Sequence, residues 1–167
     1  MRKMTEDNLK NAFAGESQAH IKYLAFADKA QQDNLPNVAR LFRASSYSEQ
    51  VHATNHLRTL DGIGKTADNL TAAMGGENFE VTEMYDAYKA VAERQGEKGA
   101  LWAFNAALKA EEVHAGLYKT AKEAVARGQD TDATAIHVCS VCGFTVEGAA
   151  PDKCPVCGAP KEKFIRF

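Results

Sequence analysis

The distribution of proline and cysteine along the 167 residues divides this chain into two unlike parts. All four cysteines and three of the four prolines follow residue 138, whereas Pro36 is the single proline that precedes it. Proline breaks a helix interior because it removes a backbone hydrogen bond, so a long stretch without it favours long helices. The sequence therefore predicts a helical domain over residues 1–128, a polar linker over 129–135 and a small cysteine-bearing domain over 136–167.

Apolar residues recur at helical spacing in four segments of the first part. The segments cover about residues 5–32, 36–62, 77–95 and 98–127, and a long connection over 62–76 joins the second to the third, with a short helix near 67–73. Short connections on either side of one long crossover are typical of a ferritin-like four-helix bundle. Strands are expected only in the tail, at 136–138 and 164–167. The predicted fold class is mainly α, a ferritin-like bundle followed by a small β domain.

Charge and hydropathy exclude two classes of partner. Lysine and arginine number 20 against 22 acidic residues, so no basic surplus exists to hold a nucleic-acid backbone. Apolar stretches such as residues 100–108 reach about half of the ~20 residues needed to cross a bilayer, and the N-terminus has no apolar core of a secretory signal. A soluble, cytoplasmic protein is expected.

Two helical segments each carry a Glu-x-x-His motif, Glu49 to His52 and Glu111 to His114. Residues three apart share one face of a helix, so each pair can direct its side chains at one point. A surface glutamate and a solvated histidine explain a single motif of this kind better than a metal does. The remaining helices strengthen the metal interpretation, because Glu16 precedes Glu49 by nearly the same interval as Glu80 precedes Glu111.

One glutamate from each of two helices plus Glu-x-x-His from the other two is the ligand set of a carboxylate-bridged di-iron site. Oxygen ligands with two imidazoles suit iron or manganese. A further carboxylate, Glu83, stands three residues after Glu80, whereas Ala19 holds the equivalent place after Glu16. We interpret Glu83 as a ligand candidate for chemistry beyond iron binding, the alternative being a solvated surface glutamate.

Four other side chains near these motifs have two interpretations each. His20 and His56 have no partner in the repeat and are expected to be structural or to support the ligands. Tyr23 and Tyr88 lie close to the inward faces of their helices. They are either core aromatics or hydrogen-bond donors to metal-bound carboxylates, and the two roles are compatible.

The tail contains two Cys-x-x-Cys knuckles, Cys139 to Cys142 and Cys154 to Cys157, each followed by glycine. A module of about 30 residues cannot bury enough apolar surface to fold unaided, so it needs a metal or disulfides. A cytoplasmic setting and the clustering into knuckles favour a tetrahedral thiolate site over disulfides. The spacing alone leaves zinc and iron open.

These motifs together resemble the rubrerythrin family over essentially the whole chain. The resemblance is carried by Ala14-Gly15-Glu16-Ser17-Gln18-Ala19, Glu49-Gln50-Val51-His52, Gly76-Glu77-Asn78-Phe79-Glu80 with Glu83-Met84-Tyr85, Glu111-Glu112-Val113-His114, and the two knuckles. It implies a non-haem di-iron site in the bundle, one iron in a rubredoxin-like tail, and reduction of hydrogen peroxide to water in oxidative stress defence. Electrons are expected from a rubredoxin or an NAD(P)H-dependent reductase. A homodimer or larger assembly is implied, and exchange of helix pairs between protomers is left open.

The resemblance also implies roles for single residues. Glu49 and Glu111 would bridge the two irons, Glu16 and Glu83 would bind one of them, and Glu80 and His114 the other. His52 would replace Glu83 when the site is reduced, which makes His52 and Glu83 the catalytic candidates. The implied ligands of the tail iron are Cys139, Cys142, Cys154 and Cys157.

Two other functions fit part of the pattern. A ferritin-like ferroxidase or iron store would use the same carboxylates with oxygen as the oxidant, although it needs no electron-entry module. A structural zinc ribbon used for partner docking would explain the tail alone.

Overall fold

The computed structural model describes residues 1–132 and 134–167, which form two compact units, residues 1–64 and 65–167. The described residues are mainly helical, as predicted. The domain division into 1–128, 129–135 and 136–167 stays a prediction, and Ala133 of the proposed linker lies outside the described residues. No helix in the described part of the chain is both long and apolar enough to cross a membrane.

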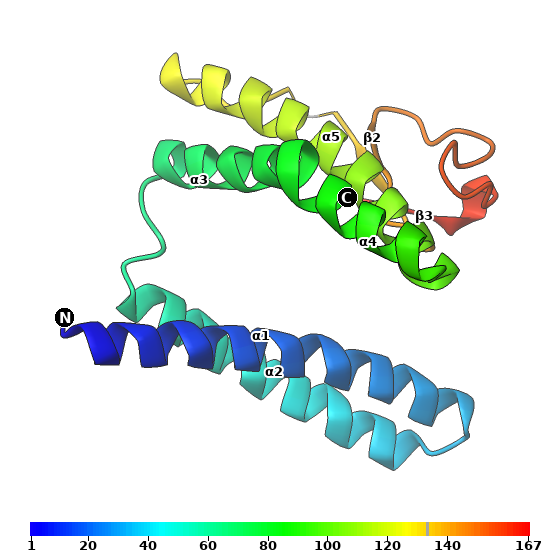
Figure 1. The fold of residues 1–167 in the computed structure, drawn as a ribbon, viewed down its shortest axis with the longest axis horizontal. Helices are drawn as coiled ribbons and strands as arrows, with labels where there is room; N and C mark the ends of the chain where they lie inside the picture. Colours follow the sequence, from blue (N-terminus) through cyan, green and yellow to red (C-terminus); the bar gives the residue numbers. More distant parts are fainter. Residues whose placement is uncertain (133) are drawn as a thin grey trace. The chain divides into compact units, whose positions relative to one another are not determined.

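The first unit is an antiparallel helix pair, α1 (Lys3–Gln32) and α2 (Pro36–Thr59), drawn in blue and cyan in Figure 1. Pro36 takes the first helical position of α2, where its missing N–H costs nothing. The two helices approach closely because small residues, Ala27, Ala39 and Ser46, fill the contact and are fully buried. The Ser46 hydroxyl donates to the His20 carbonyl at 2.9 Å and lies 2.9 Å from the His20 ring, which indicates a structural role for this histidine.

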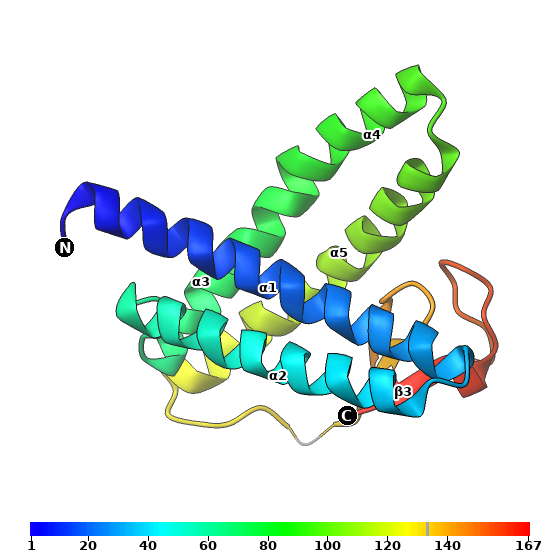
Figure 2. The same ribbon diagram turned by 90° about the horizontal axis from the view of Figure 1, so that it is seen from below.

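The second unit begins with α3 (Thr66–Phe79), which continues through one π-helical turn, η1 (Glu80–Met84), into α4 (Tyr85–Gln95). Figure 2 shows these three elements as one continuous rod, with α5 (Lys98–Ala126) returning beside it. The short helix expected near 67–73 is present but longer, since it begins at Thr66 and continues through Gly75 and Gly76, so the connection is shorter than the expected 62–76. Partly buried residues at positions 70, 73, 74 and 77 follow helical spacing, and packing of this stripe on α5 outweighs the low helix propensity of glycine.

The tail forms a three-stranded antiparallel sheet in the order β2-β1-β3. Its strands are β1 (Ile136–Cys139), β2 (Thr145–Glu147) and β3 (Phe164–Arg166), and a short 3-10 helix, η2 (Lys161–Lys163), precedes β3. The first and last strands agree with the sequence-based expectation, whereas β2 was not expected. β2 pairs with β1 through Val138 opposite Thr145, and it also contacts α5.

Candidate metal centres

The helix pair of the first unit brings three predicted ligands together. His52 Nδ1 lies 2.9 Å from Glu49 Oε2 and 3.9 Å from Glu16 Oε1. The Glu49–His52 contact is the i,i+3 pair of one helix face, and packing of α1 on α2 adds Glu16. The cluster therefore offers two carboxylates and one imidazole to a metal, with ligand atoms within 4.8 Å of one another. His56 is not part of it.

The second unit contains a cluster of the same composition and nearly the same geometry. His114 Nδ1 lies 2.7 Å from Glu111 Oε2 and 3.8 Å from Glu77 Oε1. α5 supplies the Glu-x-x-His pair, and α3 supplies the opposing carboxylate. The internal repeat expected from the sequence is thus present in space, but the structure places Glu77 where Glu80 was expected.

Two features of the sequence agree with Glu77 as the ligand from this helix. The interval from Glu77 to Glu111 is only one position longer than the interval from Glu16 to Glu49, whereas the interval from Glu80 is two positions shorter. Glu16 and Glu77 also each follow a glycine directly. In this alignment Glu80, and not Glu83, stands opposite Ala19 and breaks the repeat.

The π-helical turn explains why Glu83 does not reach the cluster. The Tyr85 N–H donates to the Glu80 carbonyl, an i→i−5 bond that inserts one extra residue into the turn. One residue corresponds to about 100° of rotation around a helix, so side chains after Glu80 no longer keep an α-helical register with Glu77. Glu80 is half-buried and Glu83 is exposed. Among the residues that the structure describes, Glu83 joins neither carboxylate cluster.

Burial and mutual repulsion dominate the electrostatics of the second cluster. Burial raises the pKa of Glu77 to about 7, and the Glu111 carboxylate contributes to the rise. Burial and Glu111 also raise the pKa of Glu80. Carboxylates held together against repulsion are stabilised by a divalent cation, which replaces their protons. The donor set fits the two hard, carboxylate-rich halves of a di-iron site.

Tyr23 and Tyr88 take one of the two roles expected for them, aromatic packing. Tyr23 packs with Phe26 and Phe42 at ring distances of 6.3 and 6.1 Å, and the exposed Tyr88 packs on Phe104 at 5.6 Å, so both are aromatic packing residues. Tyr85 is the tyrosine whose pKa the acidic cluster changes. Burial raises the pKa of its phenol, as do the nearby carboxylates of Glu80, Glu111 and Glu77. Tyr85 therefore keeps its proton and can donate a hydrogen bond there.

Alanine replacement distinguishes Glu77, which the structure places in the cluster, from Glu83, which was the predicted ligand. Glu77→Ala is expected to lower the affinity of the second cluster for ferrous ion by at least about 10-fold, because it removes one of three converging ligands. Glu83→Ala is expected to change it by less than about twofold, because an exposed glutamate outside the cluster holds no metal. Anaerobic ferrous titration with metal analysis measures both. The reverse order of effects would restore Glu83 as the ligand.

The raised pKa of Glu77 also predicts the pH dependence of stability in metal-free protein. A carboxyl whose folded pKa is near 7, against an ordinary value of 4.5, favours the folded state most at low pH. That contribution is lost as pH rises through about 7. Glu77→Gln should therefore raise the melting temperature relative to wild type by roughly 2–6 °C at pH 8 and by little at pH 5. Circular dichroism with Glu112→Gln as control checks this; parallel pH profiles would contradict it.

The four cysteines of the tail converge as predicted. Cys139 Sγ lies 3.7 Å from Cys157 Sγ, and Cys142 Sγ lies 3.5 Å from Cys154 Sγ. A tetrahedral metal with bonds of about 2.3 Å requires sulfur separations of about 3.8 Å, so this arrangement fits a thiolate-bound metal. All four are free thiols, which removes the disulfide alternative.

Each knuckle closes through a glycine in the left-handed region. Gly143 and Gly158 have φ of 79° and 73° and donate to the Cys139 and Cys154 carbonyls at 2.9 Å. Burial alone would raise the pKa of Cys154, but the N–H groups of Cys157 and Val156 donate to its sulfur and bring the pKa to about 7. The cluster therefore stabilises a thiolate at Cys154, whereas burial raises the pKa of Cys142 and of Cys157, whose protons a metal would have to displace.

Comparison with known proteins agrees with this pair of sites. The sequence profile of the rubrerythrin family matches residues 7–122, and that of the rubrerythrin rubredoxin-like domain matches 137–165. Rubrerythrin-2 of Clostridium acetobutylicum is 38% identical, with 98% of this chain and 97% of the relative covered. Nigerythrin of Nitratidesulfovibrio vulgaris is 33% identical over 98% of this chain and 86% of its own. Solved nigerythrin structures, one of them described as fully reduced and all ferrous, match with a TM-score of 0.56, 33% identity and the same coverage.

A ferritin-like helical fold with carboxylate–histidine clusters and a four-cysteine knuckle site defines an iron-binding protein of the di-iron carboxylate class. The predicted fold class is thereby confirmed. The chain belongs to the rubrerythrin family. Members of this family are di-iron oxidoreductases of oxidative stress defence with a rubredoxin-like iron site, and this chain carries candidate sites for both.

Proposed function

We propose that this protein is a non-haem peroxidase that reduces hydrogen peroxide to water and receives its electrons through the four-cysteine site. The main support is that one chain contains two equivalent clusters and a four-cysteine site. Each cluster has two carboxylates and one imidazole. A di-iron centre of this class takes two such clusters as its ligands. Two irons bound by them would supply the two electrons needed to cleave one O–O bond.

Side chains of the two clusters take different roles as metal ligands in this proposal. Glu16, Glu49, His52, Glu77, Glu80, Glu111 and His114 are the ligands we propose, with Glu49 and Glu111 as bridges. Glu80 replaces Glu83 as the sixth carboxylate, because it is half-buried beside Glu111 and breaks the internal repeat. We propose that the protonated phenol of Tyr85, whose pKa burial and these nearby carboxylates raise, donates a hydrogen bond to one of them and so orients ligand oxygens.

Two measurements on protein purified without added metal test this function. Metal analysis with a visible spectrum should give about three irons per chain and the red colour of ferric thiolate. Anaerobically reduced protein should then consume about one peroxide for each two electrons stored at the carboxylate site. Iron accumulation well beyond about three per chain would favour the storage function. A colourless tail that holds only zinc would favour the docking function, and either result would overturn the proposal.

Rubredoxin or an NAD(P)H-dependent reductase is the electron donor we propose, acting in the cytoplasm. Four unpaired thiols support a reducing compartment, where disulfides are rare. A homodimer or larger assembly is proposed because each unit exposes large apolar side chains, such as Leu41 and Tyr47 in the first and Val91 and Trp102 in the second. Burial of such groups drives association.

Mixing two inactive variants tests whether helix pairs are exchanged between protomers. Glu16→Ala and Glu111→Ala chains are refolded together. With exchange, each heterodimer combines one intact first unit with one intact second unit, so about a quarter of all sites regain iron and peroxidase activity. Without exchange the mixture stays as inactive as either variant. Wild type carried through the same refolding is the control.

A further inference from the structure

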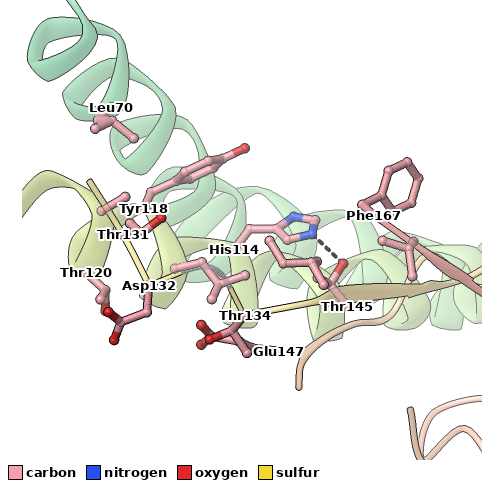
Figure 3. Close-up of a pocket in the computed structure, with 14 residues that line it drawn as sticks. Leu70, His114, Tyr118, Thr120, Thr131, Asp132, Thr134, Thr145, Glu147 and Phe167 are labelled. Atoms are coloured by element: carbon pink, nitrogen blue, oxygen red, sulfur yellow. Dashed lines mark hydrogen bonds between the residues drawn. The ribbon is translucent and has the colours of Figure 1, made fainter. Parts of the chain in front are cut away.

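A threonine of the tail contacts a candidate ligand of the second carboxylate cluster. Thr145 Oγ1 lies 2.8 Å from His114 Nε2, the contact drawn as a dashed line in Figure 3. Thr145 is only 3% exposed. Its hydroxyl also donates to the Gly143 carbonyl at 3.2 Å. Since Gly143 directly follows Cys142, one hydroxyl connects a cysteine knuckle with the imidazole of the carboxylate cluster.

We propose that Thr145 is a positioning residue that orients the His114 imidazole for metal binding and joins it to the four-cysteine site. This inference rests on the proposed function, because it assigns His114 to the carboxylate metal site and the cysteines to electron entry. It concerns a contact between two segments far apart in the sequence that the motifs of neither segment predict.

The contacts of His114 fit a metal on one ring nitrogen and a proton on the other. Because the Thr145 hydroxyl can give its one proton to the Gly143 carbonyl, its oxygen is free to accept from Nε2–H when a metal occupies Nδ1. A proton on Nε2 leaves the lone pair on Nδ1. Nδ1 is the atom that faces the carboxylates of Glu111 and Glu77, where a metal would bind. Hydrogen bonding of the second ring nitrogen is the usual way in which a metal-binding histidine is held in the correct tautomer.

The sheet of the tail holds Thr145 in place for this contact. Thr145 begins β2 opposite Val138 of β1, and the Cys139 N–H donates to the Phe144 carbonyl at 2.9 Å. The hydrogen bond to His114 also lies at the wall of a cavity of about 550 Å³ whose lining includes Leu117, Ile136 and Val138. Thr145 itself is 3% exposed, so its hydroxyl is shielded from competition by water.

The same contact supplies a bonded route for electrons. From the Cys142 sulfur the route follows the peptide to the Gly143 carbonyl and crosses two hydrogen bonds to the His114 ring. With iron held at both sites, one electron would pass in each event, so that the cysteine-bound iron would go from ferrous to ferric and the iron at the carboxylate site from ferric to ferrous. No atom is transferred.

Histidine NMR on zinc-loaded full-length protein tests the positioning role without any redox reaction. Long-range ¹H–¹⁵N spectra should show the His114 proton on Nε2 in wild type and in Thr145→Ser, which keeps the hydroxyl. Thr145→Val, which is close in shape, should expose this proton to faster solvent exchange and lower zinc affinity at the carboxylate site by about 10-fold or more. Thr59→Val, the same change at an exposed position of α2, should match wild type. A proton on Nδ1 in zinc-loaded wild type would overturn the inference whether or not the valine variant folds.

Electron transfer within the iron-loaded protein provides the second measurement. After rapid reduction of the cysteine-bound iron, its reoxidation by the carboxylate site should be slowed by about 10-fold or more in Thr145→Val and restored in Thr145→Ser. Unchanged transfer and unchanged zinc affinity in the valine variant would reduce Thr145 to a packing residue. Peroxide consumption by chemically reduced wild type tests the proposed function separately, because it does not involve the cysteine route.

Discussion

Replacement of Glu111 by alanine is expected to remove iron from the carboxylate centre and to reduce peroxide reduction to background. Glu111 Oε2 lies 2.7 Å from His114 Nδ1, and the same carboxylate raises the pKa values of Glu77 and Glu80, so it lies at the middle of the second cluster. Loss of a ligand shared by two ions should lower metal affinity by at least about 100-fold. Iron analysis and anaerobic peroxide assays measure the effect.

The adjacent glutamate is a matched control for this replacement. Glu112 points away from the cluster, since both of its carboxylate oxygens accept from Lys109 Nζ at 2.8 Å on the exposed side of α5. Surface ion pairs of this kind contribute about 0–1 kcal/mol, so Glu112→Ala should keep its iron and its activity. Equal loss of iron in the two variants would show that Glu111 is not the bridging carboxylate.

Replacement of Cys154 by serine is expected to abolish electron entry while leaving iron at the carboxylate centre. Cys154 is buried, and its thiol has the pKa of about 7 that favours thiolate binding of a metal. Serine supplies no thiolate, so the tail should lose its iron and its red colour. Peroxide reduction coupled to NAD(P)H should fall to background, by at least about 100-fold.

Chemically reduced Cys154→Ser protein is the informative control for this second replacement. It should still consume about one peroxide for each two electrons supplied, because the carboxylate ligands lie on helices and not in the knuckles. Retention of NAD(P)H-coupled activity at the wild-type rate would mean that electrons enter elsewhere. Loss of iron from the carboxylate centre as well would show that the tail supports that centre, as the Thr145–His114 contact allows.

Local sequence patterns were sufficient for much of the fold and for most of the candidate ligands. The Glu49–His52 and Glu111–His114 pairs converge because residues three apart share a helix face, a property of any α-helix. The two knuckles close because Gly143 and Gly158 allow positive φ directly after the second cysteine of each pair. The extent of α3 was missed, because Gly75 and Gly76 have low helix propensity and it is packing on α5 that stabilises helix there.

The sequence by itself determined the donor types of the candidate metal sites, through carboxylates and imidazoles at helical spacing and thiols in two knuckles. Tertiary structure decided that Glu77 faces His114 and Glu83 does not, because the π turn over 80–84 changes the register of the helix after Glu80. It also decided that Thr145 meets His114, since that contact depends on how the tail packs against α5. Hydrogen-bond register and the packing of distant segments depend on the whole fold, whereas the spacing of ligands along one helix is local.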